Sequence, residues 1–103
     1  MAIQRLDPNT MTKMPGLHQT VKTGNTVYIA GQVALDEEGN FHGEGSAASQ
    51  LSQIYKNLAR ACEAYGGTLA DMVKTTTYIT EVAHFAAVSE ARQQAYGADA
   101  PVN

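Results

Sequence analysis

The sequence predicts an α+β fold in a single domain, residues 1–103, from three observations. β-Branched and aromatic residues flank a glycine-asparagine pair near residue 25, which is typical of a β-hairpin. From Ser46 onward apolar residues recur at steps of three and four, which is typical of an amphipathic helix. A run rich in Thr, Val and Ile then lies between this helix and a second helical segment, and it indicates a further strand.

The first predicted strands lie within Leu17 to Gln32, on the two sides of Thr23-Gly24-Asn25. The second of them, Thr26 to Ala30, is β-branched and aromatic, so the pair reads as a hairpin. Asp36 to Asn40, "DEEGN", has the composition of another turn. Together these segments predict a meander of three strands.

The first helix is predicted to begin near Ser46 or Ser49, either of which can cap it, and to end at Gly66-Gly67. Its apolar stripe consists of Leu51, Ile54, Tyr55, Leu58, Ala61, Cys62 and Tyr65. This stripe should face the core.

A strand is predicted over Met72 to Thr80, with Val73, Thr75, Thr77 and Ile79 on one face. A second helix is predicted from about Val82 to Tyr96, stopping at Gly97. Its buried line is expected to be Phe85, Val88, Ala91 and Tyr96.

The closing letters "ADAPVN", residues 98–103, predict the entry to another strand, since proline biases its neighbour toward extended backbone. A helix between two parallel strands is the usual crossover, so the second helix should return the chain to the sheet. We therefore expect the domain to lack its last strands in this sequence.

Composition excludes several function classes. Seven Lys and Arg against ten Asp and Glu give a net charge of -3 with no basic run, which argues against a nucleic-acid partner. No apolar run approaches the roughly 20 residues of a membrane span, and the first residues do not resemble a leader, so a cytoplasmic protein is predicted. The lone Cys62 excludes an internal disulfide and a multi-cysteine metal site.

Few residues offer chemistry by themselves. Cys62 lies on the apolar stripe of the first helix, where a buried, inert thiol is expected rather than a nucleophile. His18, His42 and His84 lie far apart in the sequence and are expected to be solvated or locally hydrogen bonded. The acidic run at 36–38 is expected to be a solvated turn.

Three segments resemble one family in the same order: "TGNTVYIAGQVALDEEGNFHGEG", "AASQLSQIYKNLARACEAYGGTLADMVKTTTYIT" and "FAAVSEARQQAYG". This is the YjgF/RidA family of reactive-intermediate deaminases, also known as L-PSP endoribonuclease-like proteins. The resemblance begins at about Leu17. It implies a chorismate-mutase-like fold, a sheet with two helices packed on one face, and a homotrimer with ligand clefts between subunits. It also implies hydrolysis of enamines and imines without metal or cofactor.

The resemblance places the ligand site at Leu17, Ala30, Gly31, Ser89, Val102 and Asn103. Leu17 and Ala30 stand where the family has tyrosine and serine, and Ser89 stands where it has asparagine. Asn103 follows Pro101 and Val102 where the family has the arginine that anchors the substrate carboxylate. The family's later glutamate has no counterpart in this sequence. Standard 2-aminoacrylate deaminase activity is therefore not expected.

Arg92 offers a replacement anchor, because it lies three residues after Ser89 and shares its helical face. The alternative is a solvated surface arginine. Two functions stay open at this point: a divergent enzyme acting on an imine, enamine or related nitrogen compound, and a non-catalytic trimer that binds a small metabolite. A ribonuclease is disfavoured by the acidic balance.

Overall fold

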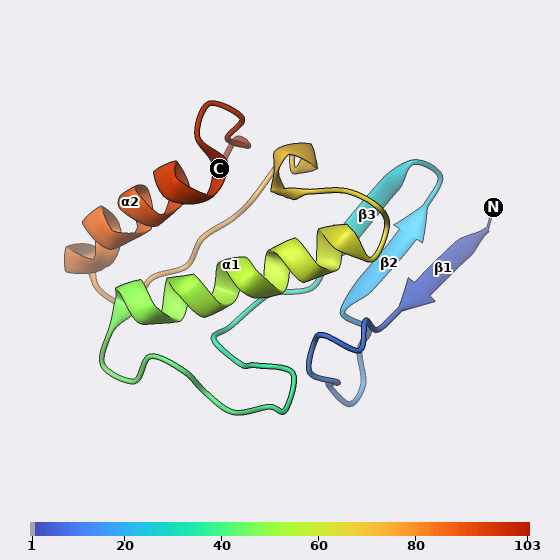
Figure 1. The fold of residues 1–103 in the computed structure, drawn as a ribbon, viewed down its shortest axis with the longest axis horizontal. Coiled ribbons are helices and arrows are strands. Elements are labelled where there is room, and N and C mark those ends of the chain that lie inside the picture. Colours follow the sequence, from blue (N-terminus) through green and yellow to red (C-terminus); the bar gives the residue numbers. More distant parts are fainter. Residues whose placement is uncertain (1) are drawn as a thin grey trace.

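The computed structural model describes residues 2–103. They form an antiparallel sheet of β1 (Ile3–Leu6), β2 (Thr20–Thr23) and β3 (Thr26–Ile29), followed by α1 (Ala47–Glu63) and α2 (Phe85–Tyr96). Short 3₁₀ helices cover 69–71 and 82–84. Figure 1 shows α1 crossing the molecule toward the sheet, with α2 running in the same direction. The α+β class is confirmed.

The predicted hairpin is confirmed, whereas the predicted meander is wrong. Gly24 has φ +59° at the first position of the two-residue turn, the place where a type II′ turn requires glycine, and Thr23 pairs with Thr26 across it. The turn at 36–40 forms, but the chain around it makes only an isolated bridge between Leu35 and Phe41. The third strand is instead β1, which pairs antiparallel with β2.

α1 begins and ends as the sequence predicts. Ser46 is the N-cap, and its side chain accepts a hydrogen bond from the backbone N–H of Ser49 at 3.2 Å. Gly66, with φ +78°, turns the chain away after the last helical residue. Within the helix Leu51 and Ala61 are buried, but so are the polar Gln53 and Asn57. The buried face of α1 is therefore partly polar.

α2 matches its predicted end but not its predicted start. The predicted helix from Val82 is a 3₁₀ turn up to His84 and becomes α-helical only at Phe85. The N–H of Gly97 donates to the carbonyl oxygen of Gln93 and closes the helix. Phe85 was expected in the buried line, yet it is 67% exposed, because it opens the helix where no described segment covers it.

The predicted strand at 72–80 is wrong in extent. This segment forms one parallel bridge, between Lys74 and Val102. The N–H of Thr75 donates to the carbonyl oxygen of Val102 at 2.9 Å, and the N–H of Val102 donates to that of Val73 at 3.2 Å. One bridge is too short for a ladder. It nevertheless confirms that α2 returns the chain in parallel beside this segment.

The two helices and the sheet are joined by specific contacts. The rings of Tyr55 on α1 and Tyr96 on α2 pack edge to face with centroids 5.6 Å apart. Tyr65, just beyond α1, is hydrogen bonded through its hydroxyl to Thr20 of β2 at 2.8 Å. The buried apolar residues are Met11, Ala34, Leu51, Ala61, Val88 and Tyr96. In the described residues, no helix has both the length and the apolar character that crossing a membrane requires.

Candidate functional site

Leu17, Ala30 and Gly31 lie at the end of the hairpin away from its turn. The N–H of Ala30 donates to the carbonyl oxygen of Gln19 at 2.9 Å, which continues the pairing of β2 with β3. Leu17 is 48% exposed and Gly31 is exposed, so this end of the hairpin presents an apolar side chain beside open backbone. A Cβ built on Gly31 meets no atom within 4 Å. The surface next to Gly31 is therefore open.

A chain of side-chain amides holds this part of the backbone in place. The Nε2 of Gln32 donates to the Oε1 of Gln19 at 2.8 Å and to the carbonyl oxygen of Ala30 at 3.2 Å. Buried Gln19 in turn donates from its own Nε2 to the carbonyl oxygen of Thr12. Gln19 carries no sequence signal of this role, because a glutamine beside a strand is usually solvated.

Arg92 is the centre of a second polar group, formed where α2 meets residues 75 and 101–103. Its Nη1 donates to the Oγ1 of Thr75 at 2.9 Å and to the Oδ1 of Asn103 at 3.3 Å, and its Nη2 donates to the carbonyl oxygen of Pro101 at 3.1 Å. Its Cζ lies 5.5 Å from the centre of the Tyr96 ring. Arg92 is thus a fixed, half-buried residue, and the expectation of a solvated surface arginine is wrong.

Asn103 is held by the same group. Its Oδ1 accepts hydrogen bonds from the hydroxyls of Thr75 and Thr77, both at 3.0 Å, in addition to the one from Arg92. The two threonines lie in the run that was interpreted only as a strand, so their polar role was missed. The alternation that placed them on one face of the segment was the signal available for it.

Ser89 and Val102 lie beside this group without joining its hydrogen bonds. The Oγ of Ser89 accepts from the Nε2 of Gln93 at 3.3 Å. Val102 pairs through its backbone with the 73–75 segment, and its side chain is exposed.

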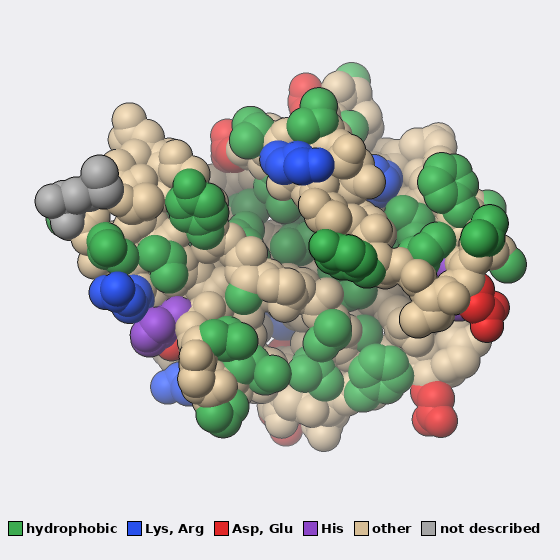
Figure 2. All heavy atoms as spheres, turned by 180° about the vertical axis from the view of Figure 1, so that it is seen from behind, with side chains coloured by type: hydrophobic (Ala, Val, Ile, Leu, Met, Phe, Trp, Pro, Cys, Tyr) green, Lys and Arg blue, Asp and Glu red, His purple; other side chains and the backbone are tan. Residues whose placement is uncertain are grey.

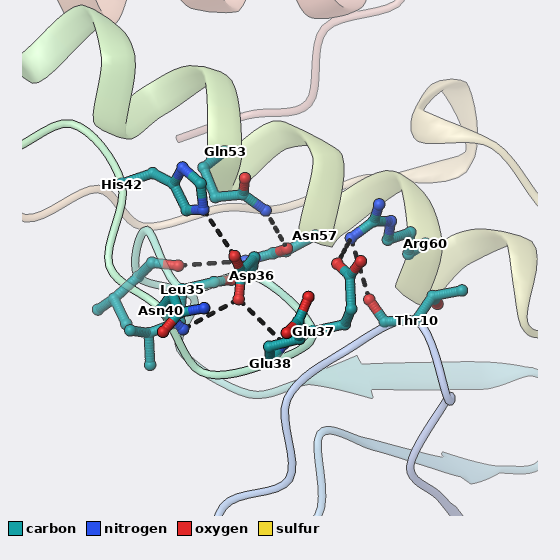
Figure 3. Close-up of polar contacts among 11 residues, drawn as sticks. Thr10, Leu35, Asp36, Glu37, Glu38, Asn40, His42, Gln53, Asn57 and Arg60 are labelled. Carbon is teal, nitrogen blue, oxygen red and sulfur yellow. Dashed lines mark hydrogen bonds and ion pairs between the residues drawn. The ribbon is translucent and has the colours of Figure 1, made fainter.

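The segment 33–42 forms a third polar cluster, against α1 (Figure 3). The carboxylate of Asp36 accepts from the Nε2 of His42 at 2.7 Å and from the N–H groups of Glu38 and Asn40 at 2.9 Å each. These bonds, with that of His42 first, hold the pKa of Asp36 below its ordinary value. A solvated acidic turn was expected here. The turn forms, but the Asp36 carboxylate is hydrogen bonded within it.

Asn57 and Arg60 attach this segment to α1. The Nδ2 of buried Asn57 donates to the carbonyl oxygens of Val33 and Leu35, and Arg60 is paired with Glu37 at 3.0 Å. Asn57 belongs to the Asn-Leu pair on which the resemblance partly rests, but the sequence did not predict its contacts. All these groups are used in holding the segment.

Cys62, His18 and His84 lie outside these three polar groups. Burial, and next the nearby Asp71, raise the pKa of the Cys62 thiol, which agrees with an inert cysteine. His18 and His42 are hydrogen bonded to Asp7 and Asp36, and His84 is partly exposed 3.7 Å from Glu81, so the expectation of solvated or locally hydrogen-bonded histidines is confirmed. Within residues 2–103 no group of three or more His, Cys, Asp or Glu is placed to hold a metal ion.

Comparison with known proteins adds to this geometry. The sequence model of the family described as endoribonuclease L-PSP matches residues 9–103. The chain belongs to this YjgF/RidA family. Among its relatives, a RutC family protein of Pyrococcus abyssi is 30% identical over 83 residues, which are 81% of this chain and 65% of that protein.

Another YjgF/RidA relative is the human protein named 2-iminobutanoate/2-iminopropanoate deaminase. It is 29% identical over 83 residues, which are 81% of this chain and 61% of the human protein. The chain therefore spans less than two thirds of the length of either relative.

Solved structures confirm the expected L-PSP/RidA fold. RidA from the Antarctic bacterium Psychrobacter sp. PAMC 21119 superposes with a TM-score of 0.87 at 35% identity, covering 96% of this chain and 80% of that one. Yeast Mmf1 superposes with a TM-score of 0.91, covering 98% and 81%, and at 17% identity it supports the fold alone.

In this RidA-family fold the expected site residues occupy two places. Leu17, Ala30 and Gly31 form one group at the hairpin, and Ser89, Arg92, Val102 and Asn103 form the other around α2 and the last residues. No hydrogen bond joins the two groups within residues 2–103. The expected site residues of one chain therefore fall into two groups.

Proposed function

We propose that the protein is a divergent RidA-like deaminase that hydrolyses an imine or enamine of a small nitrogen compound in a cleft between subunits of a homotrimer. The observation that carries this proposal is the family match over residues 9–103, together with relatives named as imine deaminases. The division of the expected site residues into two groups supports it, because two subunits can bring the hairpin group of one beside the Arg92 group of another.

The reaction requires few groups from the protein. An enamine takes a proton on carbon to become an imine, water adds to the C=N carbon, and the resulting carbinolamine loses ammonia to leave a carbonyl. Because an iminium carbon is already electrophilic, the protein mainly has to hold the substrate and position a water molecule. Leu17 and Ala30 would supply an apolar wall for the side chain of the substrate.

The trimer is supported by the apolar surface of the single chain. Figure 2 shows hydrophobic side chains spread over much of the face opposite to that of Figure 1. Tyr78 is 90% exposed, and Val73, Val82, Phe85 and Val102 are also largely exposed. Large exposed apolar side chains of this kind are often covered at an interface between subunits.

Ammonia release tests the activity. The purified chain is given a panel of freshly generated imines, with and without a carboxylate, and ammonia is measured against the spontaneous rate. We expect Gly31→Val to abolish release while leaving thermal stability unchanged, because a side chain fits at Gly31 without a clash but would occupy the open surface. Ala86→Val, at an exposed site on α2, is the matched control. No release from any imine at high protein concentration would contradict the proposal.

Light scattering tests the assembly. We expect a trimer for the parent chain and for Asn25→Asp, an exposed site in the hairpin turn, and a smaller species for Tyr78→Asp. Because Tyr78 is exposed in the single chain, its substitution should leave the folded subunit intact. A monomeric parent chain would exclude a site shared between subunits.

A second candidate is a non-catalytic trimer that binds a small metabolite. Leu17 and Ala30 favour it, since the family's hydroxyl groups are absent from both positions. Metabolites that stabilise the trimer and are recovered unchanged would support this function and exclude the enzyme for those compounds.

A further inference from the structure

The segment between β1 and β2 carries a histidine whose ring is fixed by a carboxylate. The Nδ1 of His18 lies 2.8 Å from the Oδ2 of Asp7, the residue that follows β1. The other oxygen of that carboxylate, Oδ1, accepts from the backbone N–H of Gln19 at 2.8 Å. The bond from Gln19 therefore holds in place the carboxylate that orients the ring of His18.

These bonds decide which ring nitrogen of His18 carries the proton in the neutral imidazole. The bond from the N–H of Gln19, and next the bond with His18, hold the pKa of Asp7 below its ordinary value. An ionised carboxylate only accepts, so the Nδ1 of His18 is the donor and Nε2 keeps a lone pair. The Nε2 makes no hydrogen bond within residues 2–103, and the side chain of His18 is 46% exposed. This nitrogen is thus open to a molecule from outside.

The backbone of His18 adjoins the hairpin group of the expected site. His18 directly follows Leu17, and the next residue, Gln19, accepts at its carbonyl oxygen from the N–H of Ala30. Gly31, which follows Ala30, has the open surface described above. In the sequence, His18 is the one titratable residue adjacent to a member of the hairpin group.

We propose that His18, with its ring oriented by Asp7, is the proton-transfer residue of the cleft. This inference rests on the proposed function and deepens it, because it assigns the acid and base steps to a named side chain. A carboxylate bound to the Nδ1–H orients an imidazole and stabilises its protonated form, which leaves Nε2 to exchange a proton with the substrate. Asp7 is a positioning residue in this arrangement.

Every proton of the proposed reaction can pass through this Nε2. Protonated His18 donates its Nε2 proton to the enamine carbon, which leaves an iminium ion and a neutral imidazole. The imidazole takes a proton from the water whose oxygen bonds to the iminium carbon, and a neutral carbinolamine forms. The imidazolium then protonates the amine nitrogen, and the C–N bond breaks with its electron pair leaving on ammonia. As the carbonyl forms, Nε2 takes the hydroxyl proton, so His18 ends protonated as it began.

Ammonia release from the panel of imines and enamines gives the first test, on the full chain. His18→Asn is the main variant, because asparagine keeps a donor for Asp7 in the place of Nδ1 but has no group in the place of Nε2. We expect release above the spontaneous rate to fall by about 100-fold or more, as for loss of a general acid and base, at the thermal stability of the parent. His42→Asn, in the similar pair with Asp36, is the matched control and should release ammonia at the parent's rate.

Proton exchange gives a second test that needs no deamination. Taking a proton from the carbon beside a carbonyl is the counterpart of giving one to an enamine carbon. The parent chain should therefore speed the exchange of these hydrogens in D₂O, followed by proton NMR on 2-oxobutanoate and on butanone, which has no carboxylate. We expect His18→Asn to lose the effect, Asp7→Asn to lose part of it, and added imidazole to restore it in His18→Ala.

The outcomes separate this inference from the proposed function. Equal ammonia release by the parent chain and by His18→Asn would overturn the inference and leave the deaminase standing. A loss that follows a lower unfolding temperature, and that imidazole does not restore in His18→Ala, would overturn it as well, because His18 would then be structural. Exchange that depends on His18 without ammonia release would support the proton-transfer residue and reject the deaminase. The absence of both activities would reject both proposals.

Discussion

The Nδ2 of Asn57 in α1 donates a hydrogen bond to the carbonyl oxygen of Leu35 at 2.8 Å, although the two residues are 22 positions apart in the sequence. It also donates to the carbonyl oxygen of Val33. Asn57 is 3% exposed, and both of these hydrogen bonds are part-buried. Replacing it removes the donor to the carbonyl oxygen of Leu35, whereas that of Val33 still accepts from the N–H of Leu35 at 2.8 Å. A buried polar group without a partner typically costs about 1–3 kcal/mol.

We therefore expect Asn57→Ala to lower the free energy of unfolding by about 1–3 kcal/mol. Urea denaturation measures it, with Gln94→Ala at an exposed site of α2 as the control. A change as small as that of the control would show that water satisfies the carbonyl group of Leu35 in the variant.

Thr20 and Tyr65 should be energetically coupled. Thr20 is 1% exposed and donates to the carbonyl oxygen of Leu6 at 2.7 Å, so its hydroxyl accepts the proton of Tyr65. We expect Thr20→Val and Tyr65→Phe each to destabilise the fold by about 1 kcal/mol, and the double variant to cost at least about 0.5 kcal/mol less than their sum. Additive losses in a denaturation cycle would mean that the two hydroxyls act independently.

The free energy of unfolding should fall at acid pH as Asp36 becomes protonated. Its pKa in the folded chain lies below the ordinary value of 3.8, first because of the hydrogen bond from His42. The unfolded chain then binds more protons, so this contribution is fully present above about pH 3.8 and is lost as the pH falls through the lower, folded pKa.

Asp36→Asn should therefore flatten the dependence of unfolding free energy on pH below pH 4, whereas Glu44→Gln, an exposed carboxylate elsewhere, should not. Chemical denaturation at a series of acid pH values makes the comparison. Parallel curves for the parent chain and Asp36→Asn would contradict the assignment to this turn.

Tyr96 should ionise only at unusually high pH. Burial raises its pKa to about 12, and the neighbouring Tyr55 adds to the effect. Because the folded chain holds this proton more tightly than the unfolded chain, the contribution is complete below the ordinary pKa of 10.0 and is lost as the pH rises toward about 12. Ultraviolet titration of tyrosinate should show a late step that Tyr96→Phe removes. Its persistence in the variant would assign the step to another tyrosine.

Sequence reasoning was most accurate where the information is local. The cap at Ser46 and the apolar spacing predict α1, and Gly24-Asn25 predicts the hairpin. Each of these signals lies within a few residues of the structure that it specifies. β1 was missed because "IQRL" has no alternation of apolar and polar residues. Its strand character comes from pairing with β2, and Ile3 meets Thr23 there.

The candidate site also depends on contacts between residues that are distant in the sequence. Arg92 and Asn103 were both singled out in the sequence, but their contact depends on the return of the chain after α2. Phe85 was placed in the core by helical spacing alone, which defines a face and does not say whether anything covers it.

The parallel bridge between Lys74 and Val102 has a consequence for motion. Together with the bonds of Arg92 to Thr75 and Pro101, it closes residues 74–102 into a loop that carries α2. Releasing any of these contacts weakens the others, because they hold the same two segments together. Segments closed in this way tend to open as one cooperative unit. A molecule bound at Asn103 would thus brace the whole of α2, and hydrogen exchange along that helix would slow far from the point of contact.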